Sequence, residues 1–164
     1  MIAAAALVVK KLPTVHFVLV GPGVDEQNSV IGKQIEDLGL SKHVHLLGER
    51  TDIQAILNDG NIFVLSSSFS ESFPNVLGEA MACQVPCVTT DVGDSKVIVG
   101  DTGVVVPPDK PGLLADGIMS IAKLTPELRD ELGLKARRRI EENFNLDGDD
   151  SFVRRYEKFY DETA

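Results

Sequence analysis

The chain has 164 residues, a net charge of −9, and hydrophobic and charged fractions of 43% and 25%. These values describe one globular domain of ordinary size, which can bury a core without disulfides or metals. The acidic balance argues against a nucleic-acid-binding protein, because such proteins present a basic surface to phosphates. It argues against binding to anionic membranes for the same reason.

The first nine residues are apolar and are followed by two lysines, Lys10 and Lys11. A signal peptide would carry its basic residues before the apolar run, and a bilayer-spanning helix would be about twice as long. The run therefore predicts a helix that packs on the core. Because no capping residue precedes it, we expect the chain to be part of a longer protein.

Strand-like and helix-like segments alternate along the rest of the chain. Short, continuously apolar runs predict strands at 16–20, 44–47, 61–65, 86–90 and 104–106. Apolar periodicity predicts helices at 25–38, 52–58, 74–83, 113–124, 126–143 and 149–160. Continuous apolar strands imply burial on both faces, and the alternation implies right-handed crossovers. The sequence thus predicts a single α/β domain over 1–164, with a doubly wound, Rossmann-like parallel sheet.

Two cysteines, Cys83 and Cys87, lie four residues apart in apolar surroundings. A structural metal site usually needs four ligands in a recognised spacing, so two buried free thiols in a reducing compartment fit the pattern better. We expect no metal ion and no cofactor. His43 and His45 alternate on one expected strand, which indicates packing or a sheet edge rather than a site.

In a doubly wound sheet, ligands bind beyond the carboxyl ends of the strands. Four loops are expected at that edge, at 21–26, 48–52, 66–74 and 91–96. The third is the most informative, because a helix follows it with Pro74 in its first turn. The first N–H groups of a helix have no internal partner, and together with the helix dipole they form an anion site suited to a diphosphate.

Two glutamates, Glu71 and Glu79, bracket the start of this helix. Glu79 lies about 7–8 Å along the helix axis, on the same side as Asn75. Its two carboxylate oxygens can accept hydrogen bonds from both hydroxyls of a ribose, and Glu71 is placed to meet hydroxyls on the other side of the phosphates. Spacing alone leaves a second interpretation open, in which Glu79 is a solvated flank of the helix and Glu71 only favours its dipole.

Two other loops offer weaker candidates. Gly21 and Gly23 follow a strand and permit close approach of the backbone to a ligand, but a plain turn explains them equally well. Arg50 follows the next strand, where it could stack on or bond a base. The equal alternative is a surface arginine, with Asp52 capping the next helix.

The segment Glu71-Ser72-Phe73, followed by residues 76–83, resembles the E-x7-E signature of the group 1 (family four) retaining glycosyltransferases. Supporting segments occur in the family's order at 17–23, 44–50, 101–108 and 136–144. The resemblance therefore covers nearly the whole chain. The chain departs from the family's usual sequence at two places. It has Gln84 where the family usually has glycine, and Pro74-Asn75 where the family usually has a Gly-Leu-Pro segment.

The resemblance implies that the chain is the C-terminal, nucleotide-sugar-binding half of a GT-B enzyme. Such a bacterial, cytoplasmic enzyme would transfer a hexosyl unit from a nucleoside-diphosphate sugar with retention, in polysaccharide, lipopolysaccharide or glycolipid biosynthesis. It implies Glu71 as the catalytic residue at the transferred sugar and Glu79 as the ribose ligand. The other implied donor contacts are Phe73, Pro74, Asn75, Val76 and Leu77 at the sugar and phosphates, Glu49 and Arg50 beside the base, and Gly21, Gly23, Ser66 and Ser68 along the pocket.

The resemblance also implies partners outside the chain. These are an N-terminal acceptor domain and an upstream arginine and lysine that neutralise the diphosphate, so the chain alone is expected to be inactive. Any contact with the inner face of a membrane would come through the missing domain. Two other hypotheses remain open, namely a nucleotide-sugar epimerase of similar fold and a non-catalytic nucleotide-binding module.

Overall fold

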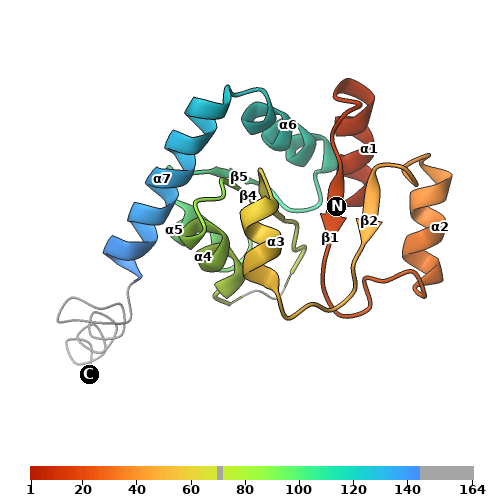
Figure 1. Cartoon of the computed structure of the whole chain (residues 1–164), viewed down its shortest axis with the longest axis horizontal. Coiled ribbons are helices and arrows are strands. Elements are labelled where there is room, and N and C mark those ends of the chain that lie inside the picture. The colour runs from red at the N-terminus through yellow and green to blue at the C-terminus, as the bar shows by residue number, and fades with distance from the viewer. Residues whose placement is uncertain (70–71, 145–164) are drawn as a thin grey trace.

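The computed structural model describes residues 1–69 and 72–144, in which strands and helices alternate (Figure 1). The strands are β1 Phe17–Leu19, β2 Val44–Leu46, β3 Phe63–Leu65, β4 Cys87–Thr90 and β5 Val104–Val106. The helices are α1 Ile2–Lys11, α2 Ser29–Asp37, α3 Ile53–Asp59, α4 Asn75–Ala82, α5 Ser95–Val99, α6 Pro111–Ala122 and α7 Pro126–Asn143. The helix expected at 149–160 lies outside the described residues.

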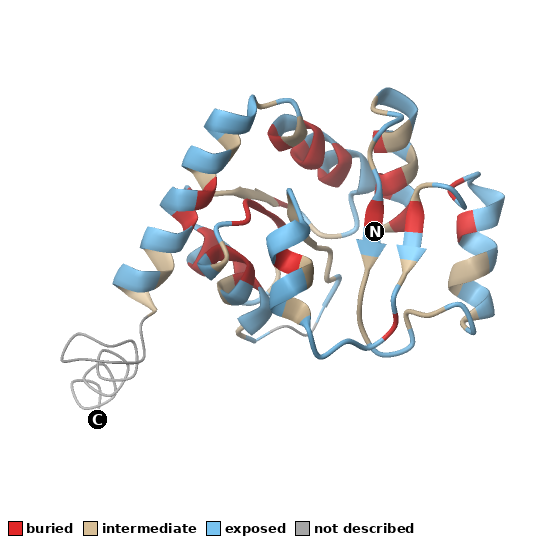
Figure 2. Ribbon diagram, viewed as in Figure 1, coloured by how far each residue is buried: buried red, intermediate tan, exposed pale blue. Residues whose placement is uncertain are grey.

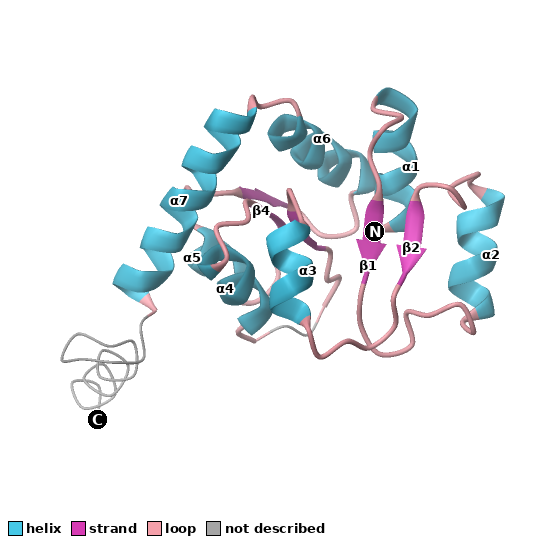
Figure 3. Ribbon diagram, in the orientation of Figure 1, coloured by secondary structure: helices cyan, strands magenta, loops and turns pink. Residues whose placement is uncertain are grey.

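All strand pairs are parallel, as predicted, but they form two separate hydrogen-bonded groups (Figure 3). The two-stranded sheet pairs β1 with β2, and Phe17 lies opposite Val44. The three-stranded sheet has the order β3-β4-β5, and Val88 at its centre lies opposite Val64 and Val104. The single continuous sheet expected from the sequence is thus divided between β1 and β3.

One apolar core joins the two sheets. Ala4 and Val8 of α1 are fully buried, and they belong to the same cluster as Phe17 of β1, Val88 of β4 and Ile118 of α6. The buried sides of α1 and α6 are visible at the top of Figure 2. The expectation that the N-terminal apolar run forms a helix packed on the core is therefore confirmed.

A second core lies on the other face of the three-stranded sheet, where α4, α5 and α7 contribute Leu77, Met81, Ile98 and Ala136, each 0% exposed. With helices on both faces, every residue of β4 is buried. Burial on both faces, expected for all strands, therefore holds for this central strand.

The same expectation is wrong for β1. Its middle residue, Val18, is 52% exposed, and His45 beside it on β2 is exposed as well. This face of the two-stranded sheet carries histidines, and the rings of His16 and His45 meet with Nδ1 and Nε2 3.0 Å apart. His43 contacts the carbonyl oxygen of Val15 through Nδ1 at 3.0 Å. His45 thus lies on a solvated face of the sheet, while the half-buried His43 precedes β2 and ties it to the residues before β1.

Two helices differ from expectation. α2 begins at Ser29 instead of residue 25, because the Asn28 side chain accepts hydrogen bonds from the N–H groups of Val30 and Ile31, both at 3.2 Å. α5 was not predicted, and it begins inside the loop expected at 91–96, since five residues give too short an apolar pattern to recognise. Within residues 1–69 and 72–144, no helix has the length and apolar character needed to cross a bilayer.

The end of α4 explains the departure at Gln84. The N–H of Val85 donates to Ala80 O at 3.0 Å and that of Gln84 donates to Met81 O at 2.9 Å, while Gln84 has φ 60°. This is a Schellman helix end, whose left-handed residue is usually glycine. A β-carbon on Gly133 of α7 would clash with the carbonyl oxygen of Gln84, so α7 packs directly on this turn.

Replacing Gln84 by glycine should stabilise the protein by about 1 kcal/mol, because a left-handed conformation costs a residue with a β-carbon roughly that much. The expected rise in Tm is about 2–4 °C for a chain of this length, measured by thermal denaturation. Gln84→Ala is the matched control, since alanine keeps the β-carbon. Equal gains from glycine and alanine would show that backbone strain is not the source.

Burial raises the pKa of the Cys87 thiol to about 12. Because thiolate is the reactive form, roughly 1 in 10,000 of these thiols would be ionised at pH 8. A disulfide-forming thiol reagent should therefore modify one cysteine, the half-buried Cys83, in the folded protein and both cysteines after denaturation. The contribution of the Cys87 thiol to the free energy of unfolding should fall as the pH rises from about 8.5 toward 12, since this thiol loses its proton first in the unfolded state.

Cys83→Ser provides the control for this experiment, because the folded variant should not react. Rapid modification of two thiols per native chain would contradict the buried position of Cys87.

Candidate functional site

The loops at the carboxyl ends of the strands form two groups. In the first, the Gly21 N–H donates to Gly48 O at 2.9 Å, and the Gly48 N–H donates to Val24 O at 2.8 Å. Gly23 and Gly48 have φ of 70° and 66°, so these turns need glycine for conformational reasons. The glycine turn after β1 therefore lies beside the segment that carries Glu49 and Arg50.

Arg50 is engaged by Asp52 in this structure. Its Nε and NH2 groups donate to the two carboxylate oxygens at 2.8 and 2.6 Å, which raises the pKa of Arg50 and lowers that of Asp52. Both side chains are nearly half exposed, so the pair contributes little to stability. The alternative of a surface arginine is confirmed in part, because Arg50 is exposed and Asp52 occupies the N-cap position of α3, although the Asp52 side chain makes no capping hydrogen bond. If Arg50 also contacted a base, its guanidinium would have to bind the base and Asp52 at the same time.

The second group consists of the loops after β3, β4 and β5. The buried Thr90 hydroxyl donates to Ser67 O at 2.6 Å, and the Ser68 hydroxyl donates to Asp109 at 2.8 Å. The N–H of Asp94 donates to Ser72 O at 3.0 Å. These bonds hold the segment that leads into α4 from both sides. Ser68 is thus committed to Asp109, while Ser66 is half-buried at the start of the same loop.

The start of α4 offers few N–H groups. Pro74 is the buried N-cap residue and has no N–H, and no side chain caps the helix. The Leu77 N–H donates to Pro74 O at 3.0 Å, and the Leu77 side chain is fully buried. Of the residues expected to line the sugar and phosphates, Asn75 and Val76 are the two exposed ones whose N–H groups the helix leaves unused.

Glu79 is exposed, one turn after Asn75 and outside the buried face formed by Leu77, Ala80 and Met81. It lies about 6 Å along the axis from Asn75, since each residue advances a helix by about 1.5 Å. Because Pro74 is the N-cap residue and α4 begins at Asn75, the helix start is one residue closer to Glu79 than expected, and the ribose role of Glu79 stays a prediction. Glu71 lies outside the described residues.

The ring of Phe73 packs against Phe144 at the end of α7, with ring centroids 5.9 Å apart and planes inclined at 56°. Both rings are partly buried against the second core. The Phe73 side chain therefore supports the loop that leads into α4. Phe144, Thr90 and Asp109 are site-shaping residues that the sequence did not single out, since each acts through a partner far away in the chain.

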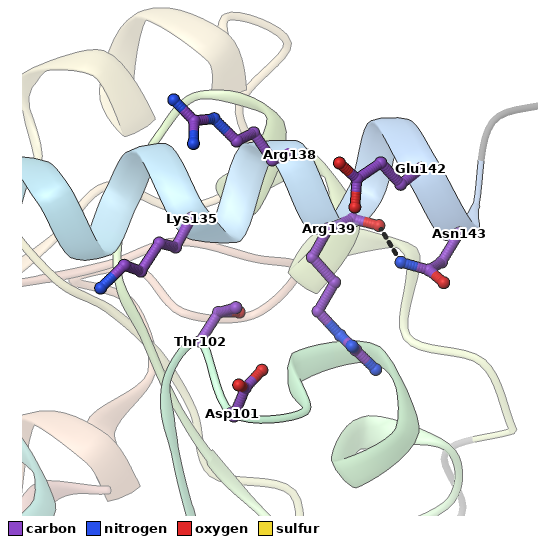
Figure 4. Close-up of a pocket in the computed structure, with 7 residues that line it drawn as sticks. All are labelled: Asp101, Thr102, Lys135, Arg138, Arg139, Glu142 and Asn143. Carbon is purple, nitrogen blue, oxygen red and sulfur yellow. Dashed lines mark hydrogen bonds between the residues drawn. The ribbon is translucent and has the colours of Figure 1, made fainter.

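A shallow cavity of about 260 Å³ lies elsewhere, between α7 and the turn at Asp101 and Thr102 (Figure 4). This turn precedes β5, so the cavity is at the amino ends of the strands, away from the loops described above. Arg139 on its wall donates to the carbonyl oxygens of Val97 and Ile98 at 2.6 and 2.8 Å. The cavity therefore lies where Arg139 of α7 donates hydrogen bonds to carbonyl groups near the end of α5.

Comparison with known proteins identifies the family. The family model described as "Glycosyl transferases group 1" matches residues 1–123. N-acetyl-alpha-D-glucosaminyl L-malate synthase of Bacillus anthracis is 32% identical over 144 residues, which cover 87% of this chain and 36% of that protein. The chain thus spans little more than a third of this relative.

Two solved structures share the fold. TarM of S. aureus (G117R mutant, in complex with fondaparinux, alpha-GlcNAc-glycerol and UDP) superposes with a TM-score of 0.79 at 32% identity, covering 88% of this chain and 29% of that one. The C-terminal domain of the group 1 family protein LpcC from Francisella tularensis gives a TM-score of 0.73 at 23% identity, covering 85% of this chain and 75% of that domain. With the parallel α/β architecture and the family match over residues 1–123, the chain belongs to the group 1 glycosyltransferases.

Proposed function

We propose that this chain forms most of the donor-binding domain of an enzyme that transfers a hexosyl unit from a nucleoside-diphosphate sugar to an acceptor with retention of configuration. The observation that supports it best is the uncapped start of α4 at the carboxyl edge of the sheet, with the exposed Glu79 one turn further on. Membership of the group 1 glycosyltransferases supports the same class of reaction. A relative that acts in polysaccharide biosynthesis, the capsular glycosyltransferase CapM of Staphylococcus aureus, supports it as well.

The donor would be bound in three parts. The diphosphate would accept hydrogen bonds from the Asn75 and Val76 N–H groups, where the helix dipole favours negative charge. The ribose would lie along α4 and donate both hydroxyls to Glu79. The base would lie toward Glu49 and Arg50, in the first loop group. A complex of TarM with UDP supports a nucleotide of this kind.

The chemical step would draw on the same helix start. As the bond between sugar and diphosphate breaks, negative charge develops on the departing phosphate, and fixed N–H dipoles stabilise it without reorganisation. Glu71 is proposed, on the basis of the family signature, to contact the transferred sugar. Since the chain spans 36% of its Bacillus anthracis relative, we propose that the acceptor domain and further phosphate-binding cations belong to a longer protein, and that this chain alone does not transfer sugar.

Replacing Glu79 by glutamine should weaken UDP binding by about ten- to a hundredfold, because hydrogen bonds to a charged group contribute about 1.5–3 kcal/mol. Removing a negative charge would by itself strengthen binding of an anion, so a loss points to direct hydrogen bonds. Isothermal titration of the native protein with UDP and with its dideoxyribose analogue measures this. The variant should bind the analogue as well as the unmodified protein does.

Asp116→Asn on α6 is the control, since Asp116 is also an exposed helical carboxylate, and its helix packs in a different core from that of α4, on the other face of the three-stranded sheet. It should leave the affinity for UDP unchanged. An unchanged affinity in Glu79→Gln would remove the ribose role and, with it, the main support for the donor site.

A further inference from the structure

The three histidines of the chain lie on one face of the two-stranded sheet. Phe17 of β1 is paired with Val44 of β2, and both side chains are buried in the core. Because side chains alternate between the two faces of a strand, the residues next to these two point away from the core. His16 therefore lies on the same face as His43 and His45, although 29 residues separate it from His45 in the sequence.

The rings of His16 and His45 face each other through single nitrogen atoms. His16 Nδ1 and His45 Nε2 are 3.0 Å apart, and the ring centroids are 5.2 Å apart with planes inclined at 21°. The two ring radii account for the rest of the centroid distance, so the rings meet edge to edge and not face to face. Such a contact holds one proton, because one ring donates and the other accepts.

A zinc ion could replace this proton with little movement. Imidazole nitrogens are common zinc ligands, and a tetrahedral ion with Zn–N bonds of about 2.0–2.1 Å holds two of them about 3.3 Å apart. The separation of 3.0 Å between His16 Nδ1 and His45 Nε2 is about 0.3 Å shorter than that. Both side chains are exposed, so slight rotations of the rings can open the distance and turn the two lone pairs toward one point.

The backbone beneath the pair is held by the sheet. The Phe17 N–H donates to His43 O at 2.7 Å, and the Leu47 N–H donates to Leu19 O at 3.0 Å. Ligands carried by paired strands keep their positions better than ligands carried by loops. The two histidines are therefore brought together before any ion binds, which lowers the entropic cost of binding.

His43 supports this pair from the side. Its Nδ1 lies 3.0 Å from Val15 O, and because a carbonyl oxygen only accepts, Nδ1 carries the proton. Its ring centroid is 5.5 Å from that of His16. Within residues 1–69 and 72–144, no three His, Cys, Asp or Glu side chains are arranged to hold a metal ion. His43 thus restricts the ring of His16 and is not counted as a ligand.

We propose that His16 and His45 form a zinc site, with His16 Nδ1 and His45 Nε2 as the two protein ligands and water in the remaining positions. Zinc that holds a fold together usually has four protein ligands, so this ion would bind more weakly and exchange with solution. It would join the residue before β1 to the middle of β2 and so clamp the two-stranded sheet. The site uses no residue assigned to the sugar donor and does not depend on the proposed function.

Calorimetric titration of the native protein with Zn²⁺ tests the site, at about pH 7.5, where most imidazoles are neutral. We expect one ion per chain. His45→Gln should lower the affinity at least tenfold, because even the loss of a group that only hydrogen-bonds to a zinc ligand costs about 10–100-fold. Mg²⁺ should not bind, since it prefers oxygen ligands. An unchanged zinc affinity in His45→Gln would overturn the proposal.

Two further variants show which side chains hold the ion. His43→Gln is the matched control, since it removes the third imidazole of the same face, and it should leave the zinc affinity unchanged. Cys83→Ser should do the same, although the half-buried Cys83 thiol is the other exposed group that favours zinc. A loss in either variant as large as that in His45→Gln would place the ion elsewhere.

Imidazole NMR signals of the unmodified protein give a measurement that does not depend on the folding of any variant. One equivalent of Zn²⁺ should shift the signals of His16 Nδ1 and His45 Nε2, the two proposed ligand atoms. The signal of His43 Nδ1 should keep its position, because this nitrogen stays bonded to Val15 O. Unshifted signals of His16 and His45 at one equivalent would contradict the site.

Discussion

The arrangement of this domain depends on the apolar contact between α1 and α6. The two sheets share no backbone ladder in the described residues, so their relative position is set by side chains of these helices and of the strands beneath them. Ala4 and Ile118 at this contact are buried from solvent. Because protein interiors are close-packed and hardly yield, this contact fixes where each sheet presents its loops.

The geometry of the candidate site depends on this contact between α1 and α6. One loop group belongs to the two-stranded sheet and carries Glu49 and Arg50, and the other belongs to the three-stranded sheet and carries Asn75, Val76 and Glu79. Within each group the positions are held locally, by Gly21–Gly48 on one side and by Thr90–Ser67 on the other. A nucleotide that contacts both groups would depend on the core that keeps the two sheets at a fixed separation.

The sequence predicted the parts of this structure that arise from local chemistry. The strands and α4 follow from apolar periodicity, although Pro74 is the N-cap residue of α4 and not part of its first turn. The position of Glu79 outside the buried face follows from helix geometry. Contacts between distant segments were not predictable in this way. The pairing of Arg50 with Asp52, the use of the Leu77 N–H by Pro74 and the ties from Thr90, Asp109 and Phe144 depend on how loops meet. The division of the sheet was also missed, because the sequence pattern of β1 suits an inner strand, whereas Val18 is half exposed.

The turn after α4 shows how tolerance to substitution can be distributed over two positions. Gln84 holds a left-handed conformation that glycine would adopt without strain, yet the chain accepts a side chain there because the residue is exposed. Gly133 has an ordinary helical backbone, but α7 rests on the Gln84 carbonyl with no space for a β-carbon. The conformational demand thus falls on one residue and the steric demand on the other. In this domain the residue in the unusual conformation is the more replaceable of the two.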